Sequence, residues 1–338
     1  MMRRVLVVAC LLLGLIAGTW LFGQSVLNQA MKLPDGGLTV DVPAGMSLRA
    51  LGDRLASDGI LRYPTVLVAY ARLLGHANSI KAGEYEIAAG TTPRGLLRQL
   101  VEGRVKLHSL TIVEGWTTRD LVRALRKSSY IRLTLVDVDD DALARAAELP
   151  GARPEGWFFP DTYRFPKGTT DLALLRMAHE RMQVILDQAW AGRAAGLPLR
   201  SPYEALILAS IVEKETALDR ERPQVAGVLI RRLKAGMKLQ TDPTVIYGLG
   251  EDFTGDLTRR QLGRDTPYNT YTRAGLPPTP ISLPGEASIL AAVHPDTSDS
   301  LYFVASPKRD GSHVFSATLR EHNAAVRRYL ESLRESAK

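Results

Sequence analysis

The chain has 338 residues, of which 45% are hydrophobic and 23% charged, and these values are ordinary for a globular protein. Its formal net charge of +7 and pI of about 9.5 favour an acidic polymer or an anionic surface as partner. The single cysteine, Cys10, excludes an intramolecular disulfide framework and a cysteine-based metal site. No recognisable nucleic-acid module accompanies the positive charge, so we expect no nucleic-acid partner.

The first segment is predicted to be a membrane anchor. Val5–Phe22 is apolar and uncharged, and its length is about that needed to cross a bilayer. Arg3 and Arg4 precede it, which favours a cytoplasmic N-terminus and an exported remainder. We expect a cytoplasmic end and single-pass anchor over residues 1–23 and a short polar linker over residues 24–37.

Two cleaved alternatives fit this segment less well. A secretory signal peptide has a shorter apolar stretch, and Gly18-Thr19-Trp20 is a poor cleavage site because it lacks the small-x-small pattern. A lipoprotein signal would end at Cys10, yet most of the apolar sequence follows that cysteine. The sequence therefore favours an anchor that stays attached.

Residues 38–150 contain a repeated pattern of strand, turn glycine and helix. Three glycines are each followed at +2 by a hydroxyl residue and at +6 and +10 by leucine, in the sets Gly45/Ser47/Leu51/Leu55, Gly90/Thr92/Leu96/Leu100 and Gly115/Thr117/Leu121/Leu125. A turn glycine, a helix N-cap and two leucines one turn apart predict a βα unit. The strands are expected over residues 38–42, 83–87 and 107–113. We expect a LysM-like α+β region, resembling modules that bind N-acetylglucosamine polymers; generic α+β packing is the alternative.

An acidic run and an aromatic run lead into the second half of the chain. Asp137–Asp141 lacks the spacing of a calcium loop and is predicted to be a solvated loop or a helix start. Gly156–Tyr163 holds four aromatic residues, which fits either a buried corner or a stacking platform for sugar rings. Helical periodicity over Leu172–Ala191 predicts a long helix after it.

The chain is organised around a helix predicted over Ser201–Thr216. Ser201 can cap this helix, Pro202 suits its first position, and Glu204 is placed to complete a capping box. The following run, Ala205–Val212, is apolar on all sides and too short to span a bilayer. We therefore expect this helix in the core of a soluble domain.

The same helix ends in two glutamates, Glu213 and Glu215. Residues three, four and seven apart share a helix face, which aligns Glu215 with Leu208, Ile211 and Val212. A carboxyl group beside an apolar wall has a raised pKa and can be a general acid near neutral pH. The alternative is a solvated surface turn, and the spacing alone leaves both open.

Loops dense in amide, carboxyl and phenol side chains follow a second helix predicted over Arg222–Ala235. Leu239–Gly248, Thr266–Tyr271 and Gly275–Pro278 could line a groove that binds hydroxyls and acetamides, although ordinary turns use the same residue types. The remaining elements are a β-hairpin and a closing helix, expected over Leu301–Val304, His313–Phe315 and Leu319–Ala337.

Several common chemistries are excluded by motif. None of the six histidines lies in an HExxH motif, and there is no GxSxG elbow, P-loop or dinucleotide fingerprint. We therefore expect neither a metal nor a cofactor.

Five stretches are together similar to the endolytic murein transglycosylase family, also called YceG-like. They are Glu155–Tyr163, Leu208–Thr216, Leu239–Gly248, Tyr268–Tyr271 and Gly275–Pro278. The N-terminal anchor and the LysM-like region fit the same family, so the resemblance covers nearly the whole chain. It implies an α+β catalytic YceG-like domain over residues 151–338.

The resemblance implies a bacterial inner-membrane enzyme whose bulk faces the periplasm. Such an enzyme cuts peptidoglycan glycan strands internally, between N-acetylmuramic acid and N-acetylglucosamine, and leaves a 1,6-anhydro end without using water. Terminating or trimming nascent strands during cell-wall elongation is the implied role. Penicillin-binding proteins of the elongation machinery are the implied partners.

The resemblance also places the catalytic glutamate within Glu-Lys-Glu, which we match to Glu215 with Glu213 in reserve. One carboxyl group can suffice, because the substrate's own C6 hydroxyl attacks where ordinary glycosidases need a second carboxylate. The candidate substrate-binding residues are Gln240, Asp242, Tyr247, Asn269 and Tyr271.

Two other functions stay open at this point. A non-catalytic murein-binding scaffold would hold cell-wall synthases and would not need Glu215. A muramidase-type hydrolase would need a second carboxylate near the site, for which Asp242 is the candidate. Product mass separates these chemistries, because hydrolysis adds water and cyclisation does not.

Overall fold

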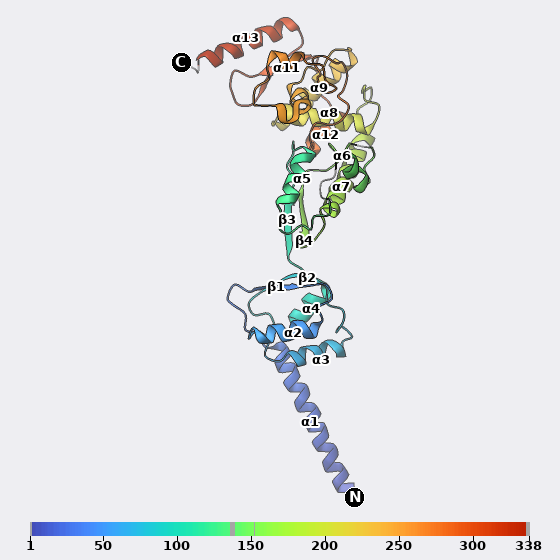
Figure 1. Ribbon diagram of the computed structural model, residues 1–338, viewed down its shortest axis with the longest axis vertical. Helices are drawn as coiled ribbons and strands as arrows, with labels where there is room; N and C mark the ends of the chain where they lie inside the picture. Colours follow the sequence, from blue (N-terminus) through green and yellow to red (C-terminus); the bar gives the residue numbers. More distant parts are fainter. Residues whose placement is uncertain (1, 136–138, 152, 336–338) are drawn as a thin grey trace. The chain divides into compact units, whose positions relative to one another are not determined.

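A computed structural model describes residues 2–135, 139–151 and 153–335 of the chain (Figure 1). Helices and two-stranded sheets alternate along these residues, so the predicted α+β class is confirmed. The chain forms two compact units. Unit 1 comprises Met1–His108 and Arg164–Thr169, and unit 2 comprises Ser109–Tyr163 and Thr170–Lys338.

The N-terminal helix α1 spans Met2–Asn28. Within the described residues it is the one helix long and apolar enough to cross a membrane. The predicted linker does not begin as a loop, because α1 continues through Gln24 to Asn28. Leu27 and Met31 are buried in unit 1, and Arg94 donates a 2.7 Å hydrogen bond to the Gln24 side chain. The first part of the predicted linker, from Gln24 to Met31, therefore belongs to the fold of unit 1.

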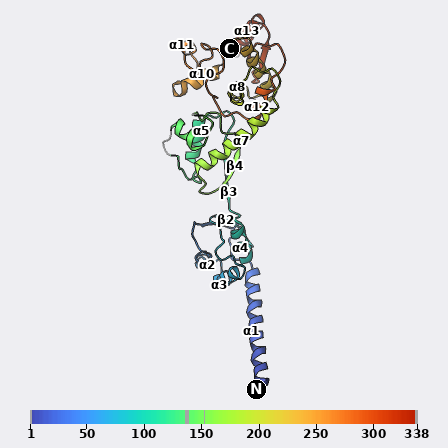
Figure 2. The same cartoon turned by 90° about the vertical axis from the view of Figure 1, so that its right-hand side faces the viewer.

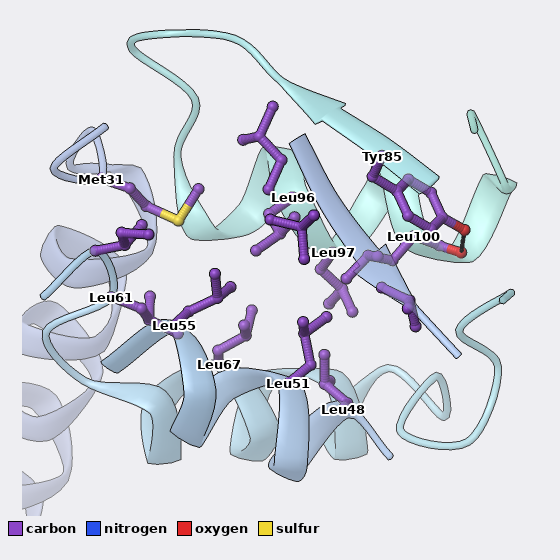
Figure 3. Packing of buried hydrophobic residues seen from close by; sticks show 14 of the residues in the cluster. Met31, Leu48, Leu51, Leu55, Leu61, Leu67, Tyr85, Leu96, Leu97 and Leu100 are labelled. Atoms are coloured by element: carbon purple, nitrogen blue, oxygen red, sulfur yellow. Dashed lines mark hydrogen bonds between the residues drawn. The ribbon is translucent and has the colours of Figure 1, made fainter. Parts of the chain in front are cut away.

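Unit 1 is built on an antiparallel pair of strands and three short helices. Alternation in the strands points Val40 and Val42 of β1, and Tyr85 and Ile87 of β2, into one core. Leucines from α2 and α4 fill that core from the other side (Figure 3). The elements are β1 (Leu38–Val42), α2 (Leu48–Ser57), α3 (Pro64–Leu73), β2 (Gly83–Ile87) and α4 (Pro93–Glu102).

The predicted repeat of glycine, cap and leucines is confirmed in all three copies. The hydroxyls of Ser47, Thr92 and Thr117 each accept a hydrogen bond from the backbone N–H three residues on. The glycines that precede the caps have φ between +76° and +85°, where a side chain would be strained. All six leucines of the pattern are buried.

The third copy of the repeat packs in unit 2, although it was expected in the same region as the other two. Its helix, α5, spans Thr118–Lys127, and α6 spans Asp140–Ala146. Asp139 caps α6, so the acidic run is a helix start; Asp137 and Val138 lie outside the described residues. Strands β3 (Leu107–Thr111) and β4 (Thr162–Pro166) pair with each other, and the boundary between the units falls within both.

The core of unit 2 surrounds helix α8, which spans Pro202–Glu215 (Figures 1 and 2). Every residue from Ala205 to Val212 is buried, as the apolar run predicts. Ser201 caps the helix, but the Glu204 carboxylate accepts from the Arg200 N–H, one residue before the cap, so half of the predicted capping box is displaced. The helices that pack on α8 are α7 (Asp171–Ala191), α9 (Arg222–Lys234), α10 (Asp242–Leu249) and α12 (Glu286–Val293).

The remaining elements of unit 2 follow the predicted order. Strands β5 and β6 form an antiparallel hairpin, and α13 packs against it. The predicted end of this last helix at Ala337 lies outside the described residues. The elements are η1 (Asp219–Glu221), η2 (Gly250–Asp252), α11 (Arg259–Gly263), β5 (Tyr302–Ala305), β6 (His313–Ser316) and α13 (Leu319–Glu335).

The aromatic run of unit 2 is a buried corner. Trp157, Phe158, Phe159 and Tyr163 all belong to the core. Trp157 stacks on Tyr203 of α8 with 5.5 Å between ring centroids and 11° between planes. The rings of this run therefore present no exposed platform for sugars.

Candidate active site

Glu215 is the last residue of α8, where the helix leaves the core. Burial and, after it, the charge of Asp242 raise the pKa of its carboxyl group to about 8, against the opposing charge of Arg232. The carboxyl is therefore mostly protonated at neutral pH and can donate a proton. Within the described residues it makes no hydrogen bond or ion pair, and the residue keeps some exposed surface. The Glu215 carboxyl can therefore hydrogen-bond to a substrate oxygen.

Glu213, two residues earlier, has the opposite surroundings. Its carboxylate accepts hydrogen bonds from Ser288 Oγ at 2.7 Å and the Gly285 N–H at 3.0 Å, and lies 3.4 Å from the Arg222 guanidinium. Its side chain is only 6% exposed. These contacts tie the end of α8 to the start of α12 and to α9. Glu213 therefore has a structural role at this junction of three helices.

Arg232 of α9 supplies a fixed positive charge beside Glu215. Its Nε donates to the Leu301 carbonyl and its Nη1 to the Leu239 carbonyl, each at 2.7 Å. The guanidinium also lies 5.2 Å from the centre of the Tyr302 ring. No described carboxylate forms an ion pair with it, so its charge remains available to a carboxylate that Glu215 would form on losing its proton.

Asp242 and Tyr271 meet in the same neighbourhood. The Tyr271 hydroxyl donates a 2.6 Å hydrogen bond to Asp242 Oδ1. Burial, this hydrogen bond and the charges of Asp242 and Glu215 all raise the pKa of Tyr271, so its hydroxyl keeps its proton. Asp242 itself is exposed at the start of α10.

Gln240 completes this cluster from a strained backbone. Its φ of +53° lies in the left-handed region that residues other than glycine seldom adopt. The exposed side chain places Oε1 3.4 Å from Nη1 of Arg232. The structure thus gathers three of the five predicted substrate-binding residues, Gln240, Asp242 and Tyr271, around Glu215 and Arg232.

Asn269 and Tyr247 do not join this cluster. Asn269 has no exposed surface, and its amide donates to the carbonyls of Leu262 and Arg264 at 2.9 and 2.7 Å. Its side-chain oxygen accepts from the Tyr271 N–H at 2.9 Å. Asn269 therefore holds the loop that presents Tyr271, and Tyr247 points to a different carboxyl group.

That second carboxyl belongs to Glu155, which is 6% exposed. It accepts hydrogen bonds from the Thr118 N–H at 2.9 Å and from the Tyr247 hydroxyl at 3.0 Å. Burial raises the pKa of Glu155 to about 7, although these hydrogen bonds oppose the shift. The group lines a cavity of about 690 Å³ between α5 and α10, and the lining does not include Glu215.

Comparison with known proteins assigns the chain to a family. The model of the YceG-like family matches residues 40–328. The chain belongs to the YceG-like family. This assignment confirms the predicted resemblance.

Two relatives of this YceG-like chain carry the name endolytic murein transglycosylase. The Bacillus subtilis protein is 29% identical over 343 residues, covering 95% of this chain and 92% of the relative. The Streptococcus pneumoniae serotype 2 protein is 26% identical, covering 94% of this chain and 63% of the relative. A solved YceG-like protein from Listeria monocytogenes is 28% identical, with a TM-score of 0.49 over 86% of this chain and 99% of that one.

Sequence reasoning missed two functional groups of this YceG-like chain. Arg231 and Arg232 are adjacent on α9, and the sequence does not show which of them lies near Glu215. In the fold, Arg232 acts on Glu215, whereas Arg231 binds the carbonyl and the carboxylate of Asp296. Glu155 heads the aromatic run, and its partner Tyr247 is 92 residues away in sequence. A glutamate directly before a buried aromatic run was the available signal for Glu155.

Proposed function

We propose that this chain is an endolytic peptidoglycan lytic transglycosylase, with Glu215 as its general acid and base. The observation that carries the proposal is the contrast at the end of α8. Glu215 is protonated at neutral pH and has no partner among the described residues, whereas Glu213 is fully engaged. The printed names of the relatives support the same activity.

The reaction needs one proton that leaves Glu215 and returns to it. Glu215 donates the proton to the oxygen that links N-acetylmuramic acid to N-acetylglucosamine, and the bond from that oxygen to C1 breaks. The resulting carboxylate then accepts the proton of the C6 hydroxyl, whose oxygen bonds to C1. The products are a 1,6-anhydro end and a free hydroxyl on the leaving sugar, and no water is consumed.

The charged neighbours of Glu215 support both halves of this cycle. Arg232 stabilises the carboxylate that exists between the two proton transfers. Asp242 favours the protonated acid at the start and the positive charge that develops at C1. Gln240 and Tyr271 supply an amide and a phenol for sugar hydroxyls and acetamides.

The location and partners belong to the same proposal. The apolar α1 helix and the preceding Arg3 and Arg4 support a single-pass inner-membrane anchor with its N-terminus in the cytoplasm and its bulk in the periplasm. Penicillin-binding proteins of the elongation machinery are the proposed partners, and trimming or termination of nascent strands is the proposed role. The charged and polar side chains described around Glu215 are Arg232, Gln240, Asp242 and Tyr271, and their positions in the chain support catalysis by residues 151–338. The LysM-like character of residues 38–150, and sugar binding by them, stay predictions.

Isotope labelling tests the reaction type. Full-length protein in detergent would digest purified peptidoglycan in water enriched in ¹⁸O, and mass spectrometry would read the new ends. We expect anhydro ends without ¹⁸O. New reducing ends that carry ¹⁸O would instead establish hydrolysis, for which Asp242 is the candidate second carboxylate. Binding of glycan without any cleavage would establish the scaffold.

A further inference from the structure

The hairpin of β5 and β6 carries three rings on one face. Phe303 lies opposite Phe315, and Ala305 lies opposite His313, so these four side chains share a face. The ring centroid of Phe303 is 5.9 Å from that of Phe315 and 5.4 Å from that of His313. We call Phe303, His313 and Phe315 the three-ring face.

The opposite face of the hairpin is occupied by the protein itself. Tyr302 stacks on His322 of α13 with 5.2 Å between ring centroids, and the Arg232 guanidinium packs on the same tyrosine. Each residue of the three-ring face keeps part of its surface exposed, as do Tyr302, Val304 and Val314 on the opposite face. What distinguishes the three-ring face is its aromatic character, and the exposed part of its rings can contact a ligand.

Hydrogen bonds through two buried side chains link the three-ring face to the residue that follows Glu215. The backbone N–H and Nδ1 of His313 lie 3.0 and 2.8 Å from the two carboxylate oxygens of Glu221. Glu221 in turn lies 3.5 Å from the hydroxyl of Thr216, the residue directly after Glu215. On the covered side, the Leu301 carbonyl at the start of the hairpin holds Arg232. The hairpin is thus attached on both faces to groups that flank Glu215.

We propose that Phe303 and Phe315, with His313 beside them, form a stacking subsite for a hexosamine ring of the glycan strand, near the bond on which Glu215 acts. The inference rests on the proposed function. A pyranose presents an apolar face of C–H groups that packs on an aromatic ring, and phenylalanine offers that contact without competing hydrogen bonds. A strand bound at Glu215 continues in both directions, so its next sugars must lie on surfaces that adjoin this residue.

Binding by an inactive protein tests this subsite apart from catalysis. Full-length Glu215→Gln protein in detergent would be titrated with soluble, peptide-free glycan strands by isothermal calorimetry. In that background, Phe303→Leu and Phe315→Leu each remove a ring and keep an apolar side chain. We expect each to weaken binding about three- to tenfold, the range that aromatic contacts typically give, and the double variant to weaken it more.

Two controls separate stacking from a structural effect. Phe303→Tyr keeps the ring and should retain wild-type affinity to within about twofold, the scale of a change that leaves the contact in place. Val304→Ala alters the covered face of the hairpin and should leave glycan affinity unchanged. The thermal midpoint of each variant shows whether the hairpin stays folded.

The outcomes distinguish the subsite from the proposed function. Weaker binding by the leucine variants, with retained binding by Phe303→Tyr and Val304→Ala, supports the subsite. Unchanged binding by the double leucine variant, or an equal loss in Val304→Ala, overturns it. Ring-dependent binding by a chain whose wild type forms no anhydro ends would overturn the transglycosylase and leave the subsite standing.

Discussion

Glu213 and Glu215 stand two residues apart on one helix and have opposite chemical surroundings. Glu213 receives two hydrogen bonds and an ion pair, which stabilise its charge. Glu215 has neither, and burial makes its charge unfavourable. The difference arises because α12 and Arg222 provide partners on the side of α8 that carries Glu213, whereas no described side chain bonds to Glu215.

The protonation of Glu215 predicts a pH dependence of cleavage. The acid form is the active one, so the rate should fall as pH rises through about 8. Asp242→Asn removes a charge that raises this pKa, so the falling limb should move to lower pH. Initial rates of anhydro-end formation between about pH 6 and about pH 9.5 measure the falling limb of the wild type and that of Asp242→Asn. A limb that stays in place or moves upward in Asp242→Asn would contradict the account.

A matched control for that shift is Asp256→Asn. Asp256 is an exposed carboxylate in the loop between η2 and α11 and does not contribute to the pKa of Glu215. Its substitution removes the same charge from the chain and should leave the limb in place.

Glu155 predicts a pH dependence of stability. Its pKa is raised from an ordinary 4.5 to about 7 in the folded chain, so the stability it contributes is fully present below about pH 4.5 and is lost as pH rises through about 7. Glu155→Gln should flatten the fall of the thermal midpoint over this range. Glu215→Gln serves as the comparison, because the pKa of Glu215 is about 8 and its contribution to stability should be lost at a higher pH than that of Glu155. An unchanged fall in Glu155→Gln would contradict the assigned pKa.

At the residue scale, the raised pKa of Glu215 could be predicted from the sequence because the pattern behind it lies on one helix. The apolar stripe of Leu208 and Ile211 runs on to Glu215, and the carboxyl has the raised pKa that this alignment predicts. Tyr247 and Asn269 could not be placed in the same way. Their partners, Glu155 and the carbonyls of a folded loop, are fixed by tertiary packing rather than by spacing.

At the scale of elements, local rules predicted helix starts and turns but not strand pairing. Caps, turn glycines and buried leucines act over a few residues, and these features of α2, α4 and α5 were predicted from sequence. The predicted capping box of α8 was half wrong, because the Glu204 carboxylate accepts a hydrogen bond from the N–H of Arg200 and not from that of Ser201. Strand pairing joins distant segments and could not be read from such rules.

The loop between α11 and α12 gives a prediction at the same scale. Asn269→Ala leaves the Leu262 and Arg264 carbonyls without their donor and frees the segment that carries Tyr271. We expect a lower thermal midpoint, with a cost of about 2–4 kcal/mol for losing these buried hydrogen bonds, and a large loss of activity. Asn323→Ala on α13, which is exposed, is the matched control and should change neither. Equal midpoints for the two variants would contradict a structural role for Asn269.

At the scale of the whole molecule, the extent of each unit depends on contacts that sequence does not reveal. The third repeat resembles the other two, yet α5 packs in unit 2 because Thr118 binds Glu155 there. The polar stretch after the anchor looked like a linker, yet it contributes Leu27 and Met31 to a core. Isolated apolar residues in a polar segment carry no periodicity from which burial could be inferred.

The fold of unit 1 predicts where the anchor can be removed. A chain that starts at Gln24 keeps the Arg94 hydrogen bond and both buried side chains, so we expect it to be soluble and to unfold at the full-length temperature. A chain that starts at Lys32 loses Leu27 and Met31 and should unfold at a lower temperature, because each buried apolar side chain contributes about 1.5–3 kcal/mol. Thermal unfolding of both truncated chains measures the difference. Identical midpoints would contradict the assignment of these residues to unit 1.

The central claim is that Glu215, rather than Glu213, is the acid of a lytic transglycosylase. The most direct measurement digests peptidoglycan with the full-length wild type, Glu215→Gln and Glu213→Gln in detergent, and reads anhydro ends by mass spectrometry beside thermal midpoints. We predict that Glu215→Gln abolishes anhydro ends at an unreduced midpoint. Glu213→Gln should lower the midpoint, because it breaks the pair with Arg222, and should retain cleavage while folded. Anhydro ends from Glu215→Gln, or their absence from folded Glu213→Gln, would contradict the claim.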